Sequence, residues 1–534
     1  MENTRHIIRK QNVLVELNGI EADGLALQGR LTVLCEQMIP TIERVLDRYG
    51  TGESHVYIDH IDIDAGTTTL ENLERNLPEA VARALDRFLR EHIPVGEHPL
   101  PFVSGNIRHT TAQSSIHEAF IYFLRTGSLP WSFRLPVGGT LEQVVSASWQ
   151  EAQEVAISPI SDKESLLQAL ADAVARKRLV HQFPPNFLEA LLFLLSPEAK
   201  EITETVLQTL HRSELSSAAR DMFIRQLWET VFAQIAAGED ITTINLVGEA
   251  WDTLPTATGN TALADILERL WPLSITRRHS VAGESIHREP RPDGLPRLEK
   301  ARFTNAVSHE GGELADAGLV PSVHASPDNM PITQRQITAA QERIIPEKVP
   351  PASTVFHNSF ITEREHPDAR DGIYIDNAGL VLLHSFLPQF FGMLGIALED
   401  KVLRPGRALC LLHYLATGQA LAPEYELVLP KILCGIPLLT PVETDLNLTV
   451  SEKEEAVALL EAVIRHWDAL RNTSPDALRG TFLLRPGKVT LREDGEWLLQ
   501  VEQKSWDVLL ERLPWGISMI KLPWMERMLW VEWR

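Results

Sequence analysis

The feature that most constrains the fold is a proline-rich stretch that divides the chain. Between Ser280 and Pro351 lie nine of the 33 prolines and one aromatic residue, Phe303. Such a stretch buries too little apolar surface to offset the entropy lost on ordering it. We therefore expect a disordered linker over 279–355, with folded parts on either side. A chain of 534 residues has room for several domains.

The residues before this linker predict an N-terminal α/β unit over 1–100. Asn12–Leu17 alternates as a strand does, and apolar residues at helical spacing predict a helix over Leu25–Tyr49. A second strand is predicted over Val56–Asp64, where apolar and acidic residues alternate, and a second helix over Thr69–His92. The order is that of a βαβα-type unit.

A helical domain is predicted over 101–278. Apolar residues recur at helical spacing in NFLEALLFLL and in MFIRQLWETVFAQI. The helical patterns are separated at Gly127–Pro130, Pro184–Pro185 and Ser196–Pro197. Short connectors between successive helices indicate a helical repeat or an irregular bundle.

After the linker we expect a helical C-terminal domain over 356–486 and a small β-rich, Trp-rich cap over 487–534. In the cap, Val489–Arg492 and Trp497–Val501 flank an Asp-Gly turn, which is a strong hairpin signal. Ile517–Leu522 and Leu529–Trp533 are predicted as two further strands. The expected fold class is α+β and predominantly helical.

Six of the 12 tryptophans lie in the cap. One interpretation is a small aromatic core. The other is a docking surface, because tryptophan also anchors protein interfaces. The candidate docking residues are Trp515, Trp524, Trp530 and Trp533.

Charge and cysteine usage limit the partners and the compartment. The formal net charge is −22, which disfavours nucleic acid and anionic membranes as partners. Three cysteines and an N-terminus without an apolar signal core predict a cytoplasmic protein. The uncharged segment Asn377–Leu398 is long enough to span a bilayer. Its His384, Pro388 and glycines favour instead a core helix interrupted at Pro388.

Two clusters contain metal-ligating residue types: Asp59, His60, Asp62 and Asp64, and separately Cys410, His413 and Cys434. We expect the first to be a solvated strand face, because no bidentate glutamate follows at calcium-loop spacing. The second offers three zinc ligands, of which Cys410 and His413 lie one turn apart in the apolar run ALCLLHYLATG, where cysteine is common in cores. With no nucleophile elbow and no Walker A loop, we expect no catalytic residue, no metal and no cofactor.

Several long motifs carry a family resemblance. At the start they are RHIIRKQNVLVELNG and YIDHIDIDAG, and near the end IYIDNAGLVLLHSFLPQFFGMLG and RLPWGISMIKLPWMERMLWVEW. FLRTGSLPW, at Phe123–Trp131, fits the same pattern. Over roughly the first 130 and the last 160 residues, the chain resembles the tape measure family of contractile injection systems.

The resemblance implies a structural, non-enzymatic protein of a phage-tail-like machine. A tape measure lies in the inner tube during assembly and sets the tube length. The implied partners are inner-tube and baseplate or hub proteins, with several copies per tube, first in the cytoplasm and then within the particle. Two alternatives stay open: a baseplate-hub scaffold or adaptor that measures no length, and a packaged effector or enzyme.

Overall fold

The computed structural model describes residues 21–49, 54–69, 71–93, 102–104, 107–136, 138–154, 158–254, 261–272, 365–443 and 446–533, with positions 6, 8, 11 and 13–15. The predicted linker, 279–355, lies outside the described residues. The described parts before and after it belong to one compact unit.

The N-terminal part pairs two helices with a small antiparallel sheet. α1 (Glu21–Leu46) packs against α2 (Leu73–His92), with side chains of both helices in one apolar cluster. The sheet has the order β1-β3-β2 and contains β1 (Ser54–Ile58), β2 (Phe102–Ser104) and β3 (Ile107–Thr111).

The strand predicted at Asn12–Leu17 is wrong for the described positions 13–15, which form no strand. Leu14 is 91% exposed, so this apolar side chain of the predicted strand packs on no core. β1 pairs with β3 instead. The second predicted strand is shorter than expected and ends at Ile58, although Ile61 and Ile63 still pack against the N-terminal cluster.

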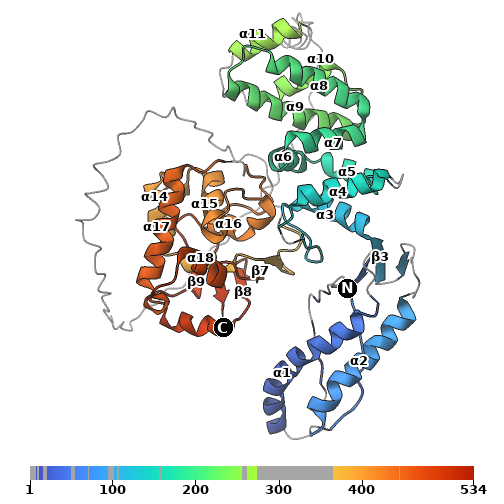
Figure 1. Cartoon of the computed structure of the whole chain (residues 1–534), viewed down its shortest axis with the longest axis vertical. Helices are drawn as coiled ribbons and strands as arrows, with labels where there is room; N and C mark the ends of the chain where they lie inside the picture. Colours follow the sequence, from blue (N-terminus) through green and yellow to red (C-terminus); the bar gives the residue numbers. More distant parts are fainter. Residues whose placement is uncertain are drawn as a thin grey trace, which may run out of the picture. The chain divides into compact units, whose positions relative to one another are not determined.

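The predicted helical region is confirmed as a series of helices (Figure 1) with one apolar cluster running through it. The connectors lie where the sequence places them, since α7 begins at Pro185 and α8 at Pro197. The helices are α3 (Ala112–Thr126), α4 (Leu141–Glu154), α5 (Lys163–Leu170), α6 (Ala173–Gln182), α7 (Pro185–Leu195), α8 (Pro197–His211), α9 (Ser217–Ala237), α10 (Thr243–Asp252) and α11 (Thr261–Leu270).

The C-terminal part combines short helices with a five-stranded sheet of order β4-β7-β8-β10-β9 (Figure 1). Its helical turns are η1 (Ala378–Leu383), α14 (Leu387–Met393), α15 (Pro405–Thr417), η2 (Glu424–Glu426), α16 (Val428–Leu433), α17 (Val450–His466), η3 (Asp468–Leu470), α18 (Pro475–Leu478), η4 (Arg479–Leu483) and η5 (Ser505–Arg512). Its strands are β4 (Ile373–Ile375), β5 (Ala397–Leu398), β6 (Lys401–Val402), β7 (Gly487–Leu491), β8 (Trp497–Val501), β9 (Met519–Ile520) and β10 (Leu529–Glu532).

The hairpin predicted from the Asp-Gly turn is confirmed as β7 and β8, which pair antiparallel around Gly495 at φ +82°. The two later strands are confirmed in shorter form as β9 and β10. β10 lies parallel to β8, and β4 pairs antiparallel with β7. The sequence did not predict β4.

One apolar cluster extends from Ile373 to Trp533 and includes residues of both the predicted C-terminal helical domain and the predicted cap. The fold class is confirmed as α+β and mainly helical, while the domain boundaries stay predictions. Within Asn377–Leu398, η1 is buried and α14 begins beside Pro388. Among the described residues, no helix is both long and apolar enough to cross a bilayer.

Candidate functional site

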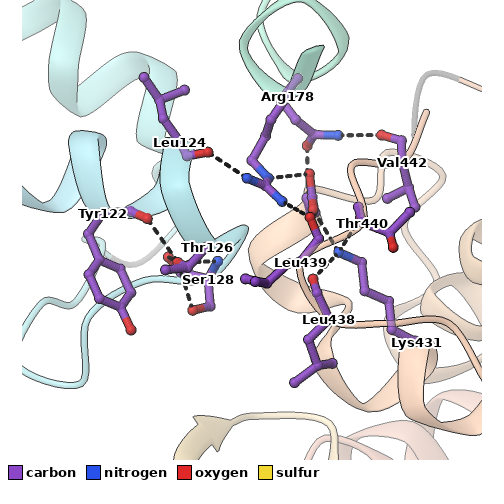
Figure 2. Close-up of polar contacts among 12 residues, drawn as sticks. Tyr122, Leu124, Thr126, Ser128, Arg178, Lys431, Leu438, Leu439, Thr440 and Val442 are labelled. Carbon is purple, nitrogen blue, oxygen red and sulfur yellow. Dashed lines mark hydrogen bonds and ion pairs between the residues drawn. The ribbon is translucent and has the colours of Figure 1, made fainter. Parts of the chain in front are cut away.

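The helical segment before residue 273 and the segment after residue 364 meet at a polar contact that we call the junction (Figure 2). It is defined by Arg178 on α6, Glu424 on η2 and Lys431 on α16. Figure 2 shows Arg178 extending from α6 toward the loops of the C-terminal segment. Arg178 and Glu424 are separated by more than two hundred residues of sequence.

The carboxylate of Glu424 is shared by two cations. The ammonium of Lys431 donates to Oε1 at 2.6 Å, and Nε of Arg178 lies 3.1 Å from Oε2. The side chains of Glu424 and Arg178 are 0% exposed, and that of Lys431 is 2% exposed. A buried charge is tolerated when it is paired and its remaining donors are satisfied.

Backbone carbonyls accept hydrogen bonds from both cations, whereas Arg178 Nε and Glu424 Oε2 form an ion pair without hydrogen-bond geometry. Arg178 donates to the carbonyls of Leu124 and Leu439, the latter at 2.7 Å. Lys431 donates to the carbonyls of Leu438 and Thr440 at 2.8 and 2.9 Å. The Arg178 fork therefore ties α3 to the loop that follows α16.

Burial lowers the pKa of the Lys431 ammonium, Glu424 opposes that shift, and Arg178 lowers the pKa further. The charge balance of the junction therefore depends on Glu424, because its single carboxylate pairs with two buried cations. Removing Glu424 would leave two like charges in contact without water.

A second group of contacts fixes the start of the C-terminal segment on α3. The hydroxyl of Tyr122 donates to Asp368 at 2.6 Å, and Ser128 Oγ lies 2.8 Å from Nε2 of His366. The backbone N–H of Asp368 donates to Nδ1 of His366, so the imidazole is neutral with its proton on Nε2. Burial and the bond to Asp368 raise the pKa of the Tyr122 hydroxyl.

The two segments also touch through Gln182, at the end of α6. Its amide donates to the carbonyl of Val442 at 3.0 Å, and its Oε1 accepts from the backbone N–H of Glu424 at 2.9 Å. The rings of Phe123 and Tyr425 meet edge to face at 5.9 Å. At the margin, Arg225 and Glu443 form an ion pair whose side chains are 49% and 44% exposed.

Gly127 ends α3 in the left-handed conformation, with φ +79°. A Cβ at this position would lie 2.5 Å from Oε1 of Glu424 and 3.1 Å from Nε of Arg178. Glycine is therefore required twice, by its backbone conformation and by the approach of the buried ion pair.

We expect Gly127→Ala to lower the free energy of unfolding by about 3 kcal/mol, because it adds steric overlap at Glu424 to left-handed strain. The matched control is Gly238→Ala. Gly238 ends α9 at φ +69° with nothing within 4 Å of its Cβ position, so only about 1 kcal/mol of strain is expected. Urea unfolding followed by circular dichroism measures both. Equal losses would contradict the close approach to Glu424.

His366 predicts a loss of stability in mild acid. Burial lowers its pKa to about 4, Asp368 opposes that shift, and Lys431 and Arg178 add to it. The unfolded chain therefore takes up a proton near pH 6.5, where the folded chain does not. The neutral His366 side chain makes its full contribution to the free energy of unfolding above about pH 6.5. That contribution, about 3 kcal/mol, is lost as the pH falls from there toward 4.

The measurement is the free energy of unfolding as a function of pH for the wild-type chain and for His366→Asn. His181, His117 and His384 also have lowered pKa values through burial, so only the difference between the two curves reports on His366. A variant curve parallel to that of the wild type would contradict the assignment.

The four candidate docking tryptophans lie at different depths. Trp524 and Trp533 are buried at 8% and 5% exposure, and their indole N–H groups donate to Leu433 and Asp507. Trp515 packs against the core and donates to the carbonyl of Leu382. Trp530 is 37% exposed on β10. Their role in docking stays a prediction.

The two sequence clusters with metal-ligating residue types have ordinary surroundings. His60 and Asp62 form an exposed pair at 2.8 Å. Cys410, His413 and Cys434 are buried, and Nε2 of His413 lies 2.7 Å from Glu426. Across the part of the chain that the structure describes, no three His, Cys, Asp or Glu side chains are grouped as a metal ion requires.

Sequence reasoning missed the junction residues. Arg178 stands in the basic run ARKRLVHQ, and Lys431 in the apolar run LVLPKILCG. A charged residue inside an apolar run is a usable signal for a buried pair. The motif FLRTGSLPW, quoted for its family resemblance, supplies Gly127, which lies against Glu424 of the junction, and Ser128, which contacts His366.

The chain is mainly helical, and two of its distant segments contact each other through buried charges. The family model for the contractile injection system tape measure protein matches residues 5–533. The chain therefore belongs to the contractile injection system tape measure family. No curated protein matches the sequence, and no solved structure matches it either.

Proposed function

We propose that the chain acts as a tape measure in the assembly of a contractile injection particle. In this role it sets the length of the inner tube and nucleates assembly of tube and baseplate. Membership of the tape measure family supports the structural role. The observation that carries the proposal is the match of the family model to residues 5–533, and the junction adds that both flanks of 273–364 lie on one body. We expect a change in the length of 273–364 to leave the contacts between these flanks in place.

The proposed partners are inner-tube proteins and baseplate or hub proteins, contacted without catalysis. Synthesis in the cytoplasm followed by incorporation into the particle is part of the proposal. The net charge of −22 favours partners with basic surfaces, because complementary fields speed association.

The closed junction sets an upper limit on what 273–364 can measure. Roughly 90 residues extend to at most about 300 Å. With both ends on one body the chain must run out and return, so its reach is halved to about 150 Å. A longer measurement requires Arg178, Glu424 and Lys431 to separate.

The same contact favours a second function, that of a baseplate-hub scaffold. Under this proposal the contacts of the junction persist when the length of 273–364 changes, as an adaptor requires. An adaptor organises assembly, and its length is immaterial to the tube.

Deletion of Arg288–Pro351 tests the two functions against each other, with particle length measured by electron microscopy. A tape measure gives shorter particles, and a scaffold gives particles of unchanged length. Deletion of the whole chain tests the packaged-effector alternative. Intact particles after that deletion would contradict both assembly roles.

A further inference from the structure

The five-stranded sheet of the C-terminal part has one face in the core and one face turned away from it. On the inner face, Val489, Leu499 and Val531 are at most 8% exposed and belong to the C-terminal cluster. Because successive side chains of a strand alternate between faces, their neighbours in sequence lie on the outer face.

The strand register arranges the side chains of the outer face in two rows that run across the strands. The first row, across β7, β8, β10 and β9, is Thr490, Leu498, Trp530 and Met519. The second row, across β4, β7, β8 and β10, is Tyr374, Lys488, Gln500 and Glu532.

Three of the four side chains in the first row are apolar although the row faces away from the core, and the hydroxyl of the fourth, Thr490, is buried. Met519 is 54% exposed and Trp530 is 37% exposed, and neither they nor Leu498 are among the side chains packed on the C-terminal cluster. The guanidinium of Arg492 lies 5.9 Å from the centre of the Trp530 ring. When one face of a sheet packs on the core, the other face is ordinarily polar, so a row of this kind indicates a contact surface.

The second row has a direction of charge. Lys488 lies on one side of β8 and Glu532 on the other, and Gln500 between them donates to the Glu532 carboxylate at 2.9 Å. Lys488 on β7 and Glu532 on β10 are equally far from β8. A two-fold rotation about an axis parallel to β8 therefore brings Lys488 of one copy opposite Glu532 of the other, so these charges are self-complementary.

We propose that a second copy of the chain packs on this outer face about such a two-fold axis. The rotation places Lys488 of each copy against Glu532 of the other. It places Leu498 against its own equivalent, and Thr490 against the indole of Trp530. The occupant is therefore a second copy, because charge and apolar surface both match when the face meets itself.

The size of the face sets the strength of the contact. Five strands about 4.8 Å apart and two rows about 7 Å apart cover on the order of 300 Å² per copy. Stable interfaces bury about 800 Å² per partner, and two chains of charge −22 repel each other at long range. We therefore expect a concentration-dependent dimer with a dissociation constant in the tens of micromolar.

Sedimentation of the full-length purified chain over about 2–200 µM tests the proposal, since this range brackets the expected constant. We expect the weight-average mass to rise from 59.9 kDa toward twice that value. Glu532→Lys, at an exposed position, sets like charges against Lys488 twice in the dimer, and should weaken association at least about tenfold. The double exchange of Lys488→Glu with Glu532→Lys should restore it to within about threefold of the wild-type value.

Trp530→Ser should also weaken the dimer, whereas Met393→Ser, at a methionine 62% exposed on α14, should leave it unchanged. A wild-type chain that stays monomeric throughout the range would overturn the proposal, including the case in which residues 273–364 cover the face. So would a dimer that ignores Glu532→Lys, or a double exchange that restores nothing. Circular dichroism of each variant separates these outcomes from misfolding, and none depends on the tape-measure role.

Discussion

Replacing Glu424 with glutamine should lower the free energy of unfolding by about 3–5 kcal/mol, because it leaves two buried cations without their counter-charge. The side chain keeps its shape, so little packing is lost. Arg178 and Lys431 would then face each other at 0% and 2% exposure.

The matched control is Glu443→Gln, which makes the same chemical change at the same interface. Its partner Arg225 and Glu443 itself are nearly half exposed. An exposed pair contributes about 0–1 kcal/mol, so the control should unfold within that margin of the wild-type chain.

Urea unfolding read by circular dichroism and by tryptophan fluorescence measures both variants. For Glu424→Gln we also expect hydrogen exchange to rise at α6 and at η2, the elements that carry the junction. Losses of similar size in the two variants would show that the buried ion pairs do not hold the two segments together.

Local signals in the sequence predicted local structure well. The Asp-Gly pair between alternating runs gives the hairpin of β7 and β8, because that turn needs only the residues it contains. The prolines at 185 and 197 mark helix starts, because proline is favoured in a first turn and not inside a helix.

Long-range partners could not be predicted from the same signals. β4 is a strand because β7, more than a hundred residues later in the sequence, pairs with it through backbone hydrogen bonds. Asn12–Leu17 has a better alternating pattern, yet Val13, Leu14 and Val15 form no strand. A strand is stabilised by its neighbour, and a single sequence does not show which neighbour it has.

The junction was hidden for the same reason. Nothing near Arg178 in the sequence identifies Glu424 as its counter-charge, since only the fold brings them together. The roles of the tryptophans near the C-terminus could be predicted only in part. A small aromatic core was one of two interpretations of the sequence, and Trp524 and Trp533 are buried in the larger apolar cluster of the whole C-terminal part. Trp530 remains on the outside of the sheet.

The proposed tape-measure role predicts a second large effect, on particle length. Deleting Arg288–Pro351 removes about 60 residues, or at most about 200 Å of extended chain. If the junction stays closed, the segment runs out and back, and the particles should shorten by at most about 100 Å. If the junction opens in the tube, the shortening can reach about 200 Å.

A length-matched control separates length from sequence. In it, Arg288–Pro351 is replaced by an equal number of residues of unrelated Gly/Ser-rich sequence, and a ruler should then restore the original particle length. Electron microscopy of particles assembled with the deletion variant is the most direct measurement. We predict particles shorter than those of the wild type, within the limits set by the junction. Particles of wild-type length that assemble normally would contradict the tape-measure role of this segment and leave the scaffold in its place.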